Sequence, residues 1–378
     1  MPKDGLHATA IGTMSILTDI KAGADTLVVH FSSRNKGAGK FHRYPTPADV
    51  SNVYINPADL NWYLDGLPDL QGLDRTVIRL RSIIEEARAS RVICMGSSMG
   101  AWGAAYMAPM LGAQKAILFG PELRLNCFAS YSAENIAHRA GEIPSISPDP
   151  SCQYVVIAGM NSPCDIYGTV SFFGGGEMPD CYFLPLMGHA TAHDLNQIGL
   201  LDGILEGLVH DHPTRPVLDA MRYKDHAALS EFFLNRPYDF QAITDYIDRF
   251  VPTKHATKFV AGVAGDLITK KLFPHAFNLL WKVYQDGAMP NDLKILLLRS
   301  ARKAKRNAQA LKVAEELAQV PTYRRDALWE KALVLERLNR ADESCAALTT
   351  LCREHLEDPI YKTAASKVSS AAFVSPAY

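Results

Sequence analysis

The sequence lacks the features of several large classes of protein. Its seven cysteines are an odd number without a Cys-x-x-Cys pair, so they predict free thiols rather than a disulfide framework or a zinc site. No apolar run is longer than a strand, so none is expected to span a bilayer. The 39 Lys and Arg residues nearly balance the 40 Asp and Glu residues. A net charge of −1 gives no general attraction to nucleic acid or to an anionic membrane.

Motifs for cofactors and for export are also missing. The segment Gly37–Lys40 lacks the first glycine of a phosphate-binding loop, and the 12 histidines include no His-Glu-x-x-His pair. The first residues, Met1–Gly5, show neither the basic start nor the apolar stretch of a signal peptide. We therefore expect a cytoplasmic protein that uses no cofactor or metal and binds neither nucleic acid nor membrane.

The first part of the chain alternates short apolar runs with helical stretches. Strands separated by helices predict a mostly parallel sheet with helices on both faces, the α/β class. The runs that predict strands are residues 26–31, 52–55, 91–95, 115–119, 154–158 and 181–184.

The composition changes near His210–Pro213, beyond which helical patterns dominate and prolines separate them. The sequence therefore predicts an α/β domain at 1–212 and an all-α domain at 213–378. Ala310 and Ser344 open two of these helices at a spacing of 34 residues, the tetratricopeptide period. The segment Leu328–Leu356 resembles such a repeat, which implies a surface for protein partners. The helical patterns lie at 238–250, 255–272, 275–286, 292–305, 308–319, 326–338 and 341–354.

The strongest chemical signal is the string Gly96-Ser97-Ser98-Met99-Gly100. It directly follows a predicted strand and precedes a helix-forming stretch. A strand-turn-helix nucleophile elbow needs this arrangement, because glycines permit the tight turn and the serine stands at its apex. Ser98 is therefore the candidate nucleophile, with Ser97 as the alternative.

A serine hydroxyl needs a base, and the base needs an orienting carboxylate. Asp165 follows the strand at 154–158, in what we expect to be a loop, and is the candidate acid. His189 comes just after the last strand and is the candidate base. Asp180 and His193 are the rivals for these two roles. The order Ser, Asp, His is that of α/β-hydrolases.

An acyl-transfer site also needs donors for the developing oxyanion. The backbone N–H of Met99, the residue after the nucleophile, is one candidate. The loop after the first strand supplies the other, from Ser32 or Ser33.

Three further residues are candidates for binding substrate. Arg34 can pair with an anionic group, although a solvated loop arginine is the alternative. Trp62 and Tyr63 can stack on a sugar, although buried packing is the alternative for both.

On the Gly96–Gly100 string, Asp165 and Gly188-His189, residues 25–212 resemble the α/β-hydrolase superfamily. The resemblance implies an eight-stranded, mostly parallel sheet and a serine hydrolase that cleaves an acyl or acetyl ester. The segments Phe31–Arg34, Gly39–Phe41, Asn61–Tyr63 and Ser98–Gly100 are similar to bacterial hydrolase-like proteins of surface-glycan and glycoprotein-export pathways.

The loop after the first strand lacks the His-Gly pair common in lipases and esterases. The alternative function is therefore a catalytically weak hydrolase-like scaffold that binds protein partners in a surface-glycan or secretion pathway. For the enzyme, the expected substrate is a small-molecule or glycan ester.

Overall fold

The computed structural model describes residues 6–8, 15–34, 37–251, 253–287 and 289–354. The chain forms two compact units, which meet in the sequence between Phe250 and Val251. Residues 1–5, on which the expectation about a signal peptide rests, and residues 355–356 of the repeat-like segment lie outside the described residues.

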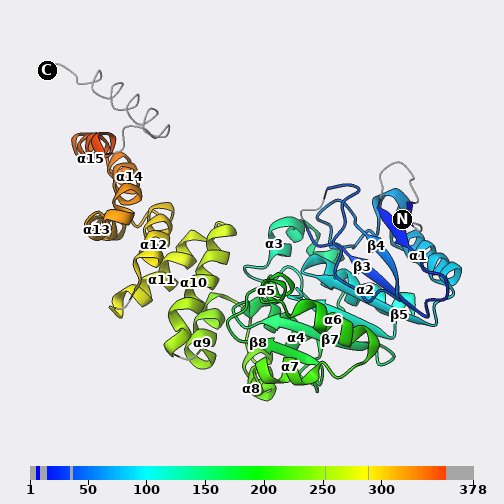
Figure 1. Cartoon of the computed structure of the whole chain (residues 1–378). Coiled ribbons are helices and arrows are strands. Elements are labelled where there is room, and N and C mark those ends of the chain that lie inside the picture. The colour runs from blue at the N-terminus through cyan, green and yellow to red at the C-terminus, as the bar shows by residue number, and fades with distance from the viewer. Residues whose placement is uncertain (1–5, 9–14, 35–36, 252, 288, 355–378) are drawn as a thin grey trace. The chain divides into compact units, whose positions relative to one another are not determined.

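The first unit is built on an eight-stranded sheet in the order β1-β2-β4-β3-β5-β6-β7-β8 (Figure 1). Strands β3 to β8 run parallel, whereas β2 is antiparallel to both of its neighbours. The strands are Leu6–Ala8 (β1), Ile16–Asp19 (β2), Thr26–Phe31 (β3), Ser51–Ile55 (β4), Arg91–Ser97 (β5), Lys115–Phe119 (β6), Gln153–Gly159 (β7) and Cys181–Leu184 (β8).

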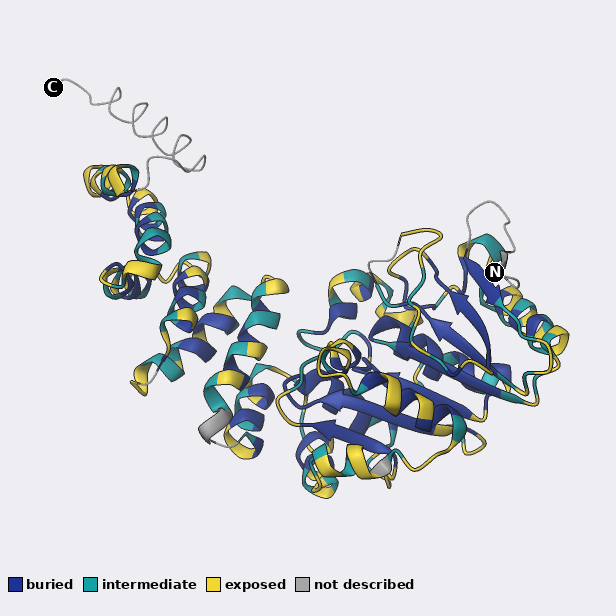
Figure 2. Cartoon of the chain, viewed as in Figure 1, coloured by how far each residue is buried: buried dark blue, intermediate teal, exposed yellow. Residues whose placement is uncertain are grey.

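All six predicted strands are present, each with ends within two residues of those expected. They are buried over nearly their whole length, as Figure 2 shows, because helices cover both faces of the sheet. The predicted fold class, an α/β-hydrolase fold followed by an all-α region, is confirmed. Strands β1 and β2 were not predicted, since strands of only three or four residues carry little periodic pattern.

Two sets of helices cover the two faces. Side chains of β5 to β8 such as Met95 and Ile157 pack with residues of α5, α6 and α7. On the opposite face, α2 packs against β3, β5 and β6, and α4 packs against β7. The helices of this unit are Leu73–Ala87 (α1), Met99–Leu111 (α2), Tyr131–Ile136 (α3), Pro163–Phe172 (α4), Thr191–Gln197 (α5), Leu201–His210 (α6), Arg215–Met221 (α7), His226–Leu234 (α8) and Phe240–Phe250 (α9), with 3₁₀ turns at Pro68–Leu70 and Ala137–Glu142.

The division at residue 250 differs from the predicted boundary at 212. Helix α7 packs against β8, and α8 packs against α4, so the chain after 212 continues to cover the sheet. The N–H of Tyr223 donates to the carbonyl of Phe183 in β8 at 2.8 Å.

The second unit is all-α, and each of its helices packs against the next one along the chain. Its tetratricopeptide-like character stays a prediction. Within the described part of the chain, no helix is long and apolar enough to cross a membrane. The helices of the second unit are Thr253–Thr269 (α10), Phe273–Gln285 (α11), Asn291–Lys303 (α12), Asn307–Leu317 (α13), Pro321–Arg337 (α14) and Ala341–Glu354 (α15).

Candidate active site

Ser98 lies at the turn between β5 and α2, with φ 55° and ψ −123°. A non-glycine residue with positive φ stores backbone strain, and such strain is typical of a nucleophile elbow. The glycines on either side permit the turn. A Cβ atom on Gly96 would lie 2.3 Å from the backbone of Gly100, and one on Gly100 would lie 2.2 Å from the carbonyl oxygen of Phe31.

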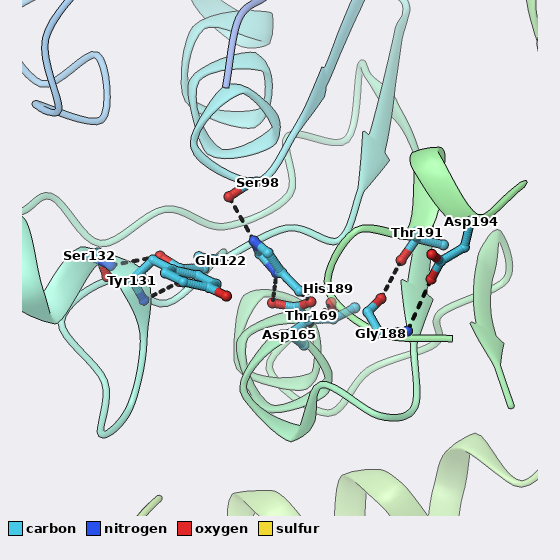
Figure 3. Close-up of polar contacts among 10 residues, drawn as sticks. All are labelled: Ser98, Glu122, Tyr131, Ser132, Asp165, Thr169, Gly188, His189, Thr191 and Asp194. Atoms are coloured by element: carbon cyan, nitrogen blue, oxygen red, sulfur yellow. Dashed lines mark hydrogen bonds and ion pairs between the residues drawn. The ribbon is translucent and has the colours of Figure 1, made fainter. Parts of the chain in front are cut away.

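The side chain of His189 lies between Ser98 and Asp165 (Figure 3). The distance from His189 Nε2 to Ser98 Oγ is 2.7 Å. The distances from His189 Nδ1 to the two carboxylate oxygens of Asp165 are 2.9 and 3.1 Å. Because an ionised carboxylate only accepts hydrogen bonds, Nδ1 carries the proton and Nε2 offers its lone pair to the Ser98 hydroxyl.

Asp165 lies in the first turn of α4, so the expectation that it sits in a loop was wrong. Pro163 starts this helix, and its fixed φ favours that position. The Asp165 side chain is fully buried, whereas that of His189 is 14% exposed. A buried carboxylate beside a partly open imidazole suits a carboxylate that orients the ring and a ring that exchanges protons.

The rival residues have other surroundings. The hydroxyl of Ser97 hydrogen-bonds to Tyr44, and burial raises the pKa of that phenol. Asp180 accepts a hydrogen bond from Gln153 Nε2 at 2.8 Å. His193 lies in α5, exposed, at the rim of the cavity that contains Ser98. The three residues that hydrogen bonds connect are therefore Ser98, His189 and Asp165, and none of the rivals belongs to this set.

The candidate oxyanion donors differ in availability. Met99 is the first residue of α2, where a backbone N–H has no partner within the helix. The N–H of Ser32 donates to the carbonyl of Ile55 at 3.0 Å, which extends the pairing of β3 with β4, so Ser32 does not fit this role. The N–H of Ser33 donates to His42 Nδ1 at 2.9 Å. Ser33 therefore becomes a donor to substrate only when His42 moves away.

Trp62 and Tyr63 do not line the site, which corrects their assignment to substrate binding. Both side chains are fully buried, so neither can stack on a sugar. The Tyr63 hydroxyl donates to the carbonyl of Ser32 at 2.8 Å. Tyr63 therefore supports the loop after β3, and the buried-packing alternative is the one that the structure bears out.

Arg34 lies beside the site, against a residue that the sequence did not single out. Its guanidinium carbon is 3.7 Å from the centroid of the Tyr131 ring, and that ring is 4.9 Å from the ring of His189. Buried Glu122 accepts hydrogen bonds from the N–H groups of Tyr131 and Ser132 (Figure 3). No local sequence pattern identifies Tyr131 or Glu122, because their link to the site is purely tertiary.

A cavity of about 550 Å³ opens at Ser98. Its lining includes polar and basic groups, among them Arg34, His42 and Tyr44, and apolar Leu201. Among the described residues, no group of three or more His, Cys, Asp or Glu side chains is arranged to hold a metal ion. The cavity has the volume of a small-molecule site.

No protein-family model and no curated protein matches the chain. Similar solved structures include an α/β serine hydrolase without a lid from Xanthomonas campestris, with 15% identity, a TM-score of 0.36 and coverage of 56% of this chain and 96% of that one. They also include the glycosylation-associated protein (Gap123) complex from Streptococcus agalactiae, with 13% identity, a TM-score of 0.36 and coverage of 53% of this chain and 45% of that one. Neither likeness is close enough to carry a conclusion about what this chain does.

Proposed function

We propose that the protein is a serine hydrolase that cleaves an ester through an acyl-enzyme on Ser98, with His189 as base and Asp165 as the orienting carboxylate. One observation carries the proposal: two successive hydrogen bonds run from Asp165 through His189 to a serine held at positive φ. A mere helix-capping serine needs neither the strained backbone nor the buried carboxylate behind the imidazole.

Acylation starts as the Ser98 hydroxyl proton passes to His189 Nε2 while Oγ bonds to the ester carbonyl carbon. The carbonyl electron pair moves to oxygen and forms the tetrahedral oxyanion. As this adduct collapses, the bond to the alcohol oxygen breaks, and that oxygen takes the proton from Nε2. Asp165 holds the ring and stabilises the imidazolium during both transfers.

Deacylation repeats these steps with water as the nucleophile. Water gives one proton to His189 Nε2 and bonds through oxygen to the acyl carbon. The bond to Ser98 Oγ then breaks, Oγ recovers the proton, and the carboxylic acid leaves. We assign the Met99 amide as the first oxyanion donor and the Ser33 amide as the second, once substrate has displaced His42.

One observation favours the second candidate, a catalytically weak scaffold. The Ser33 amide, the remaining oxyanion candidate in the loop after β3, is already bonded to His42. Loss of one such donor typically costs about 10²- to 10³-fold in rate. In this alternative the helices of the second unit, including the tetratricopeptide-like pair predicted near its end, bind protein partners. From the sequence we also expect a cytoplasmic location and, for the scaffold, a role in a surface-glycan or secretion pathway.

A fluorophosphonate probe separates the two candidates. The enzyme is expected to label in one covalent step and to hydrolyse members of a series of p-nitrophenyl esters from acetyl to octanoyl, or acetylated glycans. The scaffold leaves the probe unreacted and every ester intact above the background rate. Absence of labelling in the folded wild-type protein removes the hydrolase proposal.

A further inference from the structure

The cavity at Ser98 is lined by basic groups without acidic ones. Arg34 and Arg43 contribute fixed positive charges, and His42 and His193 contribute imidazoles. None of the described residues that line this cavity is an aspartate or a glutamate. A cleft lined by one sign of charge attracts ligands of the opposite sign.

Several arginines of this chain form ion pairs with carboxylates, whereas Arg34 does not among the residues that the structure describes. Arg139 is bonded to Asp65, Arg324 to Glu354, and Arg340 to Glu343. Within the described ranges, Arg34 forms no ion pair with a carboxylate and donates no hydrogen bond; its guanidinium lies over an aromatic ring instead. Stacking uses the face of the guanidinium and leaves the N–H groups at its edge for a planar anion.

Tyr131 fixes the position of this arginine. Its backbone is held by Glu122, which is 1% exposed, and its ring contacts both the Arg34 guanidinium and His189. The Tyr131 ring therefore lies between the Arg34 guanidinium and the imidazole of His189, which contacts Ser98 Oγ. That separation suits an anionic group on the same small molecule as the ester that reacts.

We propose that Arg34, backed by Tyr131, forms an anion subsite, and that the substrate is an ester carrying a carboxylate or a phosphate close to the bond that is cleaved. This inference rests on the proposed hydrolase function and adds the substrate class to it. Arg43, which is exposed at the rim, contributes to long-range attraction of the anion.

The test compares esters that differ only in charge. On the alcohol side, 4-acetoxybenzoate and 4-acetoxyphenyl phosphate are compared with methyl 4-acetoxybenzoate. On the acyl side, mono-4-nitrophenyl terephthalate is compared with its methyl ester. The proteins are wild type, Arg34→Gln, Arg34→Lys and the control Arg79→Gln, which alters an arginine on the surface of α1 that pairs with Glu86. Comparing each variant with wild type on the same ester cancels differences in leaving-group reactivity.

For at least one comparison of an anionic ester with its neutral counterpart, Arg34→Gln is expected to lower kcat/KM for the anionic ester by about 10- to 100-fold. The loss arises mainly from a higher KM, as expected for loss of a charge-assisted hydrogen bond. The substitution leaves the neutral ester and probe labelling unchanged. Arg34→Lys restores part of the loss, and Arg79→Gln matches wild type. On the alcohol side, the preferred leaving group, 4-hydroxybenzoate or 4-hydroxyphenyl phosphate, identifies the anion.

Equal losses on charged and neutral esters in Arg34→Gln make Arg34 a structural residue and overturn the subsite. Unchanged rates on every anionic ester overturn it as well, while the hydrolase function stands. If wild type neither labels nor hydrolyses any ester, the hydrolase function fails, and the substrate class fails with it.

Discussion

The Nε2 atom of His189 lies 2.7 Å from the Oγ atom of Ser98, although the two residues are 91 positions apart in the chain. Strands β5, β6, β7 and β8 are parallel neighbours, so their carboxyl ends meet at one edge of the sheet. Ser98 follows β5, Asp165 follows β7 and His189 follows β8. The sheet thus brings three separate segments of the chain into one site, where α/β folds commonly bind ligands.

Replacement of Ser98 by alanine is expected to abolish covalent labelling by the fluorophosphonate probe. Without Oγ no bond to the probe forms, and ester hydrolysis falls by at least about 10³-fold. Loss of one hydroxyl at a turn changes little packing, so the variant should unfold at the wild-type temperature. Labelling and thermal unfolding are measured on the same sample.

Ser97→Ala is the matched control for this prediction, since the neighbouring hydroxyl bonds to Tyr44 instead of His189. It should label at a rate close to that of wild type. Full labelling of Ser98→Ala together with loss in Ser97→Ala would move the nucleophile to Ser97.

Much of this site is predictable from sequence, because its parts have local signals. A glycine-flanked serine after an apolar run indicates the turn, and a histidine after the last run indicates the base. The signal for α4 was also present: Ser162-Pro163 is a typical helix start, so Asp165 could have been placed in a helix.

The remaining features depend on tertiary contacts that no local pattern contains. The aromatic character of Trp62 and Tyr63 is compatible with a sugar platform and with a core position, and only the packed fold shows that both are buried. The partner of the Ser33 amide, His42, and the ring beside His189, Tyr131, come from other segments. The boundary at 250 was missed because helices that cover a sheet and helices that pack on each other share one periodicity.

Replacement of Asp165 by asparagine is expected to lower kcat by about 10³- to 10⁴-fold with little change in KM. The amide can donate to Nδ1 and so favours the wrong tautomer, in which Nε2 no longer accepts the Ser98 proton. Asp180→Asn is the control, because Asp180 pairs with Gln153 outside the site. Steady-state kinetics on one p-nitrophenyl ester measure both variants. A wild-type kcat in Asp165→Asn would exclude Asp165 as the orienting carboxylate.

The stability of the protein should decline in mild acid because of His30 in β3. Burial lowers the pKa of His30 to about 4, although its hydrogen bond to Asn52 opposes the shift. Its Nδ1 atom is buried and has no hydrogen-bond partner among the described residues, so a second ring proton has no acceptor there. Between pH 6.5 and about pH 4 the unfolded chain binds a proton at this residue that the folded chain does not bind.

The free energy of unfolding therefore rises with pH across this window, and the loss caused by His30 is absent above it. The expected slope is about 1.4 kcal/mol per pH unit, so His30 accounts for a loss of about 2 kcal/mol between pH 6.5 and pH 5. Urea unfolding of His30→Gln at several pH values should show a flatter profile than wild type. His138→Gln, which alters an exposed histidine, should keep the wild-type slope, and an equal slope in His30→Gln would contradict the assignment.

An aromatic cluster in α8 and α9 joins the chain after residue 212 to the sheet. The Phe233 ring lies 5.8 Å from Tyr167 of α4 and 5.5 Å from Tyr246 of α9. The Tyr246 hydroxyl donates to the carbonyl of Met160 at 3.3 Å, just after β7 and five residues before Asp165. These helices therefore support the segment that carries the candidate acid.

We expect a fragment of residues 1–250 to fold and to label with the probe, and a fragment of residues 1–212 to do neither. Removing residues 213–250 uncovers the strand β8 side of the sheet and helix α4, and each buried apolar side chain that becomes exposed costs about 1.5–3 kcal/mol. A few such losses equal the whole stability of a typical domain, which is about 5–15 kcal/mol. Urea unfolding and probe labelling of both fragments, beside the full chain, make the comparison. A cooperative unfolding transition and full labelling in the 1–212 fragment would restore the boundary expected from sequence and would show that α7, α8 and α9 are dispensable for the site.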